Sequence, residues 1–587
     1  MNKQFKLLVL LISLLGNFAC TKKVDLSEKV INLVIVADVK GLDPIEAGDR
    51  YSSNQVGHAY EGLLEYHYLK RPYTLIPNLA EAMPTVSKDG LTYTFKIKKG
   101  VLFHDDKSFP KGIGRELIAE DFVYSLKRLA NPKLQGLGWW ILDGKIKGLN
   151  AFRENIKKLN KVDYSEVVEG IKSLDKYTLQ FKLAKPFPQF LYTLAMTYSS
   201  VVAKEAVEFY DKEFLNHPVG TGPFILPEFK RTGKIIWRKN PKYRKKFYPN
   251  QGDEKFAKLG FLQDAGKQLP LVDKIVYHIL IEDQTRWLNF AKGKIDYIEP
   301  PKDNFASAIT PAKDLTPDLM KKQVSLMIVP NLDVTYTAFN LDLKLFQNKK
   351  LRQAFASAIQ IHEVNDLLWN GNSLSAQSII PPGIAGYDPN YMNPFKGPKL
   401  EQAKRLLSEA GYPKGKGLPE ITYDCTSSTK ARQTGELLQK HLGKIGIKVK
   451  VVQNTWPKLT EKVQKRQIML YGMAWGADYP DGENFLQLLY GPNRPPGANG
   501  SGYNNPIFNK LFEKASTMQH SKQRTGLYEK LNQMVAEDMP LLFTFHRQAF
   551  GLSNKWLKNF ITTDFESTRG QYINVDPKLK AKLIKTF

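Results

Sequence analysis

The sequence predicts an α/β protein, because segments typical of strands alternate with segments typical of helices along most of the chain. Residues 91–98 alternate between apolar and polar side chains directly after a turn at 88–90, which predicts a strand of a hairpin. Residues 119–129 place apolar side chains at the spacing of one helix face. A predicted helix at 431–445 is followed by a strand at 447–452, the helix-to-strand order expected of an α/β fold.

Other segments extend this pattern in chain order. Residues 31–36 and 274–281 are predicted strands, and residues 400–410 form a second amphipathic helix. Residues 251–268 are polar and rich in Gly and Lys, so we interpret them as a surface insertion. Residues 493–505 are rich in Pro, Gly and Asn and are predicted to form a loop, the kind of segment that often carries binding residues.

Composition is that of a large globular protein. The chain has 587 residues, enough for roughly four domain-sized units, and 42% of them are hydrophobic. Two cysteines exclude a disulfide-stapled scaffold and a Cys-rich metal site. The net charge is +27, but the lysines are spread over the whole length without a basic block. We therefore expect a lysine-rich solvated surface and no nucleic-acid partner.

The N-terminus has the features of an export signal. Lys3 and Lys6 precede the apolar residues 7–15, and Ala19 precedes Cys20. We expect 1–19 to be a lipoprotein-type signal peptide, because a cysteine after a small residue resembles a bacterial lipobox. Asn17 stands where that motif usually has Leu, so a plain secretory signal is the alternative. Acylated Cys20 would anchor the protein to a membrane in the periplasm or at the cell surface.

Catalytic signatures are absent from the sequence. It contains no phosphate-binding loop, no H-E-x-x-H, no G-x-S-x-G and no G-x-G-x-x-G, and no two histidines stand four residues apart. The prediction is therefore a protein without catalytic residues, metal or cofactor. An exported hydrolase remains an alternative, since acid–base geometry does not follow from spacing.

A series of short blocks in one order resembles the bacterial extracellular solute-binding protein family 5, whose oligopeptide- and dipeptide-binding members serve ABC importers. The resemblance runs from about residue 33 to 550. The blocks lie at 42–44, 60–64, 77–81, 89–95, 100–105, 119–125, 218–224, 240–243, 351–354, 380–383, 403–407, 410–413, 475–481 and 501–503. Residues 107–116 and 251–268 depart from the family pattern as extra length.

The resemblance implies a two-lobed periplasmic-binding-protein fold (class II, cluster C type) with an additional α/β domain on lobe I. Lobe I would comprise 29–62, 190–331 and 540–587, the additional domain 63–189, and lobe II 332–539. The chain crossings between the lobes would act as hinges. The implied function is capture of short peptides by hinge closure and delivery to a membrane permease, by a monomer that is not an enzyme.

The resemblance also implies a site. The family's matching aspartate binds the peptide ammonium, which assigns that role to Asp478. Trp475, Gly476 and Ala477 would offer main-chain groups to an extended ligand. The alternative for Asp478 is a local turn. No basic residue is assigned to the ligand carboxylate. A sugar or a nickel chelate is the alternative ligand.

Two tyrosines complete the predicted site. Tyr503 and Tyr336 lie in segments that match the family, and either could contact the ligand main chain through its hydroxyl or ring. The alternative for both is core packing with a satisfied hydroxyl.

Overall fold

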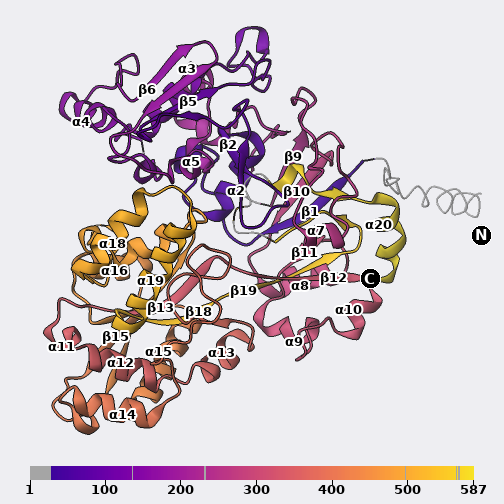
Figure 1. The fold of residues 1–587 in the computed structure, drawn as a ribbon. Helices are drawn as coiled ribbons and strands as arrows, with labels where there is room; N and C mark the ends of the chain where they lie inside the picture. The colour runs from indigo at the N-terminus through magenta and orange to yellow at the C-terminus, as the bar shows by residue number, and fades with distance from the viewer. Residues whose placement is uncertain (1–27, 135, 231–232, 496, 563–564, 566–568) are drawn as a thin grey trace, which may run out of the picture.

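The computed structural model describes residues 28–134, 136–230, 233–495, 497–562, 565 and 569–587, and its ribbon separates into two lobes and an additional domain (Figure 1). The predicted signal segment 1–19 and Cys20 lie outside the described residues. Within the described ranges, no helix has the length and apolar character needed to cross a membrane.

Lobe I is built from three separate parts of the chain. Its first sheet has the order β1-β10-β9-β8, formed by Val30–Ile35, Lys274–Ile279, Lys234–Lys239 and Phe224–Ile225, with β1 parallel to β10. Its second sheet has the order β11-β19-β12, formed by Tyr297–Ile298, Gln548–Asn554 and Val324–Pro330. The helices of this lobe are α2 (Arg50–Ala59), α5 (Phe190–Thr193), α6 (Lys204–Tyr210), α7 (Glu254–Lys258), α8 (Asp283–Ala291), α9 (Phe305–Ala308), α10 (Pro317–Lys321) and α20 (Pro577–Leu583).

The additional domain centres on an antiparallel sheet of order β4-β5-β7-β6, formed by Thr85–Val86, Thr92–Lys96, Thr178–Lys182 and Ile171–Asp175. Helices α3 (Ala119–Leu129) and α4 (Leu149–Leu159) accompany it, and the hairpin of β2 (Leu64–Tyr66) and β3 (Leu75–Pro77) connects it to lobe I. The Asp121 carboxylate accepts a hydrogen bond from the Ile118 N–H at 2.9 Å and so caps α3. The apolar side of α3 is buried in the core that this domain shares with lobe I.

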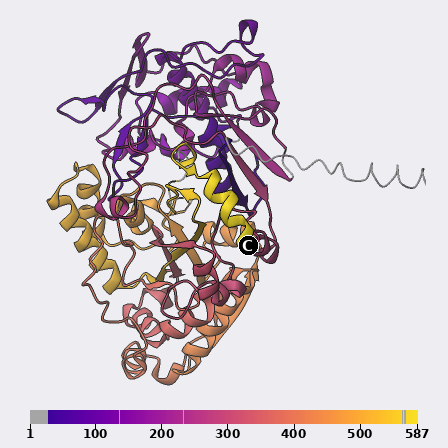
Figure 2. The same ribbon diagram turned by 90° about the vertical axis from the view of Figure 1, so that its right-hand side faces the viewer.

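Lobe II holds a six-stranded mixed sheet of order β14-β18-β13-β17-β15-β16. Its strands are Leu374–Ser375, Leu541–His546, Asp333–Phe339, Leu470–Gly476, Ile421–Thr426 and Val449–Asn454. Its helices are α11 (Lys344–Gln347), α12 (Lys349–Ala358), α13 (Ile361–Trp369), α14 (Leu400–Glu409), α15 (Thr429–Gly443), α16 (Trp456–Gln464), α17 (Glu483–Leu486), α18 (Pro506–Thr517) and α19 (Lys522–Asp538). Figure 2 shows the two lobes one above the other, and the C-terminal helix α20 lies on the side that faces the viewer.

Most of the elements predicted from periodicity are confirmed. The helix expected at 119–129 is α3 with the same bounds, and the helix–strand unit expected at 431–452 is α15 followed by β16. The segment 251–268 is largely exposed, as expected of a surface insertion, but it also contributes to a core. This segment forms α7 and buries Phe256 and Phe261 in an aromatic cluster, because its two phenylalanines have an apolar surface to cover.

The predicted return of the chain to lobe I after residue 539 was wrong by several residues. Strand β18 pairs with β13 and β14, so residues up to His546 belong to the lobe II sheet. Directly after His546 the chain crosses from lobe II to lobe I, and this crossing lies beside the earlier one at residues 331–333. The Asn331 N–H donates to the Arg547 carbonyl at 2.8 Å, and the Asp333 carboxylate accepts from the Arg547 N–H at 3.0 Å and Nε at 2.7 Å.

Lobe II also contains a buried ion pair that we expect to dominate its local stability. Arg524 and Asp481 are 2% and 1% exposed, their side chains lie 2.9 Å apart, and the Tyr528 hydroxyl donates to Asp481 at 2.9 Å. Arg524→Leu would leave the Asp481 charge buried without its partner. The expected loss is about 3–5 kcal/mol in the free energy of unfolding of lobe II, measured by urea denaturation. Arg432→Leu, which removes an exposed pair within α15, is the control and should cost less than about 1 kcal/mol. Equal losses would contradict this assignment.

Candidate functional site

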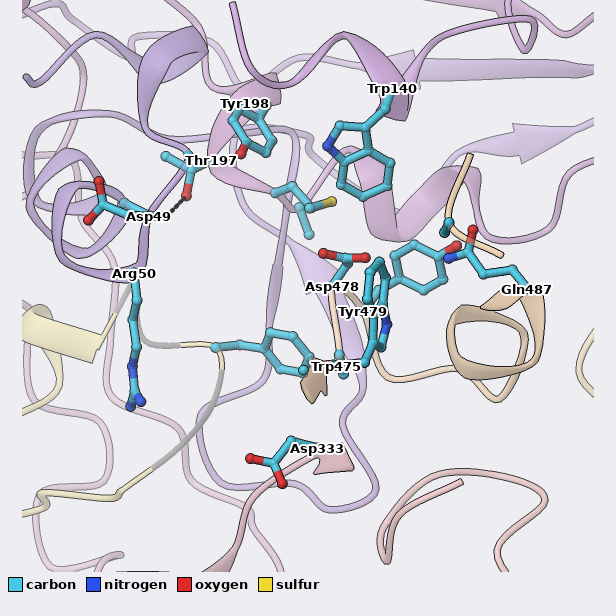
Figure 3. Close-up of a pocket in the computed structure, with 18 of the residues that line it drawn as sticks. Asp49, Arg50, Trp140, Thr197, Tyr198, Asp333, Trp475, Asp478, Tyr479 and Gln487 are labelled. Atoms are coloured by element: carbon cyan, nitrogen blue, oxygen red, sulfur yellow. Dashed lines mark hydrogen bonds between the residues drawn. The ribbon is translucent and has the colours of Figure 1, made fainter. Parts of the chain in front are cut away.

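A cavity of about 1180 Å³ lies between the lobes and is lined from both sides. Lobe I and the additional domain contribute residues such as Asp49, Arg50 and Trp140, and lobe II contributes the run from Trp475 to Tyr479. Figure 3 shows Asp478 near the middle of this space. Trp140 and Tyr198 lie above it in this view, and Arg50 lies to its lower left. The cavity is large enough for a ligand of several residues.

The wall on lobe II ends in a strand with one open edge. β17 pairs with β13 along its length, including Val334 with Trp475 and Asp333 with Gly476. On its other side β15 pairs only with Leu470 and Tyr471, so within the described residues no strand covers this edge of β17 beyond Tyr471. Gly476 is exposed there, and a Cβ atom added to it would meet no other atom within 4 Å. An extended ligand backbone could therefore approach this edge closely.

Asp478 is held in place by Asn484 of α17. The Asn484 amide group donates to the Asp478 carboxylate at 2.9 Å, and its carbonyl oxygen accepts from the Asp478 N–H at 3.0 Å. The same oxygen accepts from the Trp475 indole N–H at 3.1 Å. One fully buried amide thus fixes both the acidic group and the aromatic ring that face the cavity.

Burial raises the pKa of the Asp478 carboxyl from its ordinary 3.8 to about 6, and the hydrogen bond from Asn484 opposes this shift. Among the described residues Asp478 takes part in no ion pair within 4 Å. A carboxylate in such a setting gains stability when a cation arrives, because the cation replaces the lost hydration.

Acidic groups outnumber basic groups in the wall of the cavity, although the whole chain has a net charge of +27. Glu483 accepts a hydrogen bond from the Tyr479 hydroxyl at 2.6 Å, and burial raises its pKa to about 7. The acidic residues in the lining are Asp49, Asp143, Asp333, Asp478 and Glu483, and the basic ones are Arg50, Lys145 and Arg547. Since Asp333 binds Arg547 where the chain crosses between the lobes, the remaining wall favours a ligand with a positive charge.

The predicted site residues divide into two groups. Trp475, Gly476, Ala477 and Asp478 all line the cavity, as one continuous run. Tyr336 and Tyr503 are not in the lining; both are buried in the lobe II core, 8% and 5% exposed.

The Tyr503 hydroxyl already donates to Asp538 at 2.6 Å. The packing alternative therefore describes Tyr503, Tyr336 packs in the same core, and we propose no ligand contact for either.

Sequence reasoning did not single out several residues of the wall. Asn484 and Glu483 follow Asp478 closely in the chain, so an Asn six residues after the acidic group was the available signal. Tyr66, Trp140 and Arg50 come from other parts of the chain, and no local pattern connects them with Asp478.

The raised pKa of Asp478 generates a prediction about stability. Folding favours the protonated carboxyl in the window between 3.8 and about 6, so stability falls as the pH rises through it. Asp478→Asn should therefore stabilise the ligand-free protein above pH 6, by on the order of 2 kcal/mol, and this gain should shrink as the pH falls through that window. Thermal unfolding at several pH values measures it. Asp366→Asn on the exposed face of α13 is the control, and a gain independent of pH would contradict the prediction.

Comparisons with known proteins agree with this geometry. Residues 74–496 match the family model described as bacterial extracellular solute-binding proteins, family 5 Middle. The chain is 27% identical over 537 residues to a dipeptide-binding protein of Escherichia coli, covering 89% of this chain and 90% of that protein. It is also 27% identical to heme-binding protein A of Haemophilus influenzae, covering 90% and 88%.

A solved structure extends the comparison to the fold. The periplasmic binding protein DppA from Helicobacter pylori, in complex with the peptide STSA, aligns with a TM-score of 0.70 and 26% identity, covering 93% of this chain and 98% of that one. The two-lobed periplasmic-binding-protein fold is thereby confirmed. This protein belongs to the bacterial extracellular solute-binding proteins, family 5, and is a solute-binding protein of the ABC-transporter type.

Proposed function

We propose that this protein captures short peptides by their free amino end in the cleft between its lobes and hands them to an ABC permease. The observation that supports this best is the Asp478 carboxylate, which lies in the cleft wall with a raised pKa and without a cationic partner among the described residues. A peptide ammonium would form a charge-assisted hydrogen bond with it and lower that pKa again.

Main-chain recognition would supply affinity without selecting side chains. The open edge of β17 beside Asp478 offers N–H and C=O groups to an extended peptide, as in strand addition to a sheet. A cavity of about 1180 Å³ leaves room for side chains and for water that bridges their polar groups. Such a site accepts many sequences, which suits general uptake.

Closure of the two lobes would follow from the way the run from Trp475 to Asp478 is attached to the chain crossings. The Ala477 N–H donates to the Leu332 carbonyl at 2.8 Å, so the run that carries Asp478 is bonded to the first residues of lobe II after the crossing. The Asp333–Arg547 pair joins the two crossings. A ligand that binds Asp478 and also contacts lobe I would stabilise the form in which the lobes approach, and the permease would recognise that form.

We further propose that Cys20 is acylated and anchors the protein to the membrane. Export and anchoring are supported by the signal-like residues before Cys20. The protein would then act beside the permease as a monomer, without catalysis of its own.

The amino end of the ligand provides the test of the proposed function. Short peptides recovered from the purified protein by mass spectrometry would be resynthesised with a free and with an acetylated N-terminus. We expect acetylation to weaken binding by at least about 100-fold in calorimetry, because it removes the charge that Asp478 pairs with. Asp478→Ala should weaken binding of the free peptide to a similar extent.

Asp366→Ala, an exposed aspartate of the same lobe, serves as the matched control and should bind as the wild type does. Recovery of a sugar, a nickel chelate or heme in place of peptides would overturn the peptide assignment. Peptide cleavage by the purified protein would support the hydrolase alternative instead.

A further inference from the structure

A buried hydroxyl in the wall of the cleft has no hydrogen-bond partner among the residues that the structure describes. Tyr66, the last residue of β2, lines the cavity from the lobe I side, and its hydroxyl oxygen is closed off from solvent and unpaired among the described residues. A buried donor without an acceptor lowers stability. An unpaired hydroxyl in the wall of a cavity therefore indicates that a ligand supplies the missing hydrogen-bond partner.

The ring of Tyr66 is fixed by its neighbours. It stacks on Phe565 with ring centroids 4.7 Å apart, and on Tyr192 of α5 at 6.3 Å. Tyr192 in turn stacks on Tyr479 of lobe II at 5.8 Å and an interplanar angle of 3°. Because Tyr479 directly follows Asp478, this row of rings connects Tyr66 to the acidic group across the space between the lobes.

Electrostatics agree with this placement. Burial is the main cause that raises the pKa of Tyr66 well above its ordinary 10, and Coulombic interactions with Tyr192, Tyr73, Asp478 and Asp481 add to it. The hydroxyl therefore stays protonated, so its O–H is available to donate to an acceptor of the ligand.

From these contacts we propose that Tyr66 is a ligand-binding residue of lobe I, whose hydroxyl donates to a carbonyl oxygen of the bound peptide close to its amino end. This inference rests on the proposed function. It names the ligand group as an α-aminoacyl unit, with an ammonium for Asp478 and a neighbouring carbonyl for Tyr66. A peptide that meets both residues joins lobe II to lobe I, so the hydrogen bond from Tyr66 forms as the lobes approach.

Tyr66→Phe tests the proposal, since it removes the hydroxyl and keeps the stacked ring. Tyr391→Phe is the matched control, because the Tyr391 hydroxyl is also buried without a described partner but the residue is not in the cavity lining. The probe is a tryptic casein digest equilibrated with the wild-type protein by dialysis. The best-retained peptide is then synthesised, and its Kd is measured with each variant by calorimetry.

We expect Tyr66→Phe to raise the Kd about fivefold to thirtyfold without lowering the melting temperature of the ligand-free protein. Tyr391→Phe should stay within about twofold of the wild type. A Kd for Tyr66→Phe within about twofold of the wild type, together with lost binding in Asp478→Ala, would overturn the role of Tyr66 and leave the proposed function intact. Equal weakening by both tyrosine variants would also overturn it. If the wild type retains no peptide from the digest, both proposals fail.

Discussion

The arrangement of this cleft depends on one half-buried carboxylate that has no cationic partner among the described residues. Asp478 keeps a pKa of about 6 because its surroundings withhold water, while Asn484 holds it by two hydrogen bonds. Replacing Asn484 with a cation would remove the electrostatic cost, but it would also remove the attraction for an incoming ammonium. The neutral amide therefore orients the acid and leaves its charge available.

The two lobes are joined by contacts of different kinds at the chain crossings and at the cleft. At the crossings, Asp333 accepts hydrogen bonds from both the main chain and the side chain of Arg547, which ties the two crossing segments together. Beside Asp478 the lobes meet through stacked Tyr192 and Tyr479, and the Tyr192 hydroxyl lies 3.2 Å from the His520 ring. Flat ring contacts can slide or part at modest cost, whereas the Asp333–Arg547 pair is directional and its Asp333 carboxylate is buried.

Sequence reasoning recovered what local pattern and ordered blocks determine. The helix at 119–129 and the run from Trp475 to Asp478 were identified, because amphipathic spacing and a contiguous motif are both local properties. It assigned β18 to the wrong lobe, because the partner of a strand in a sheet is not encoded in its own residues. Tyr66 lies far from Asp478 along the chain, and only the fold places both at one cavity.

Tyr503 and Tyr336 show that a match to the family does not by itself identify a ligand-binding residue. Both lie in segments that match the family, yet Tyr503 donates to Asp538 inside lobe II and Tyr336 packs in the same core. Tyr66 is the opposite case, a tyrosine in the cavity wall whose hydroxyl has no described partner. The distinction between a structural and a binding tyrosine thus depends on whether the fold already satisfies the hydroxyl. Because a satisfied donor gains little from a ligand, an orphaned donor in a cavity is the more informative signal.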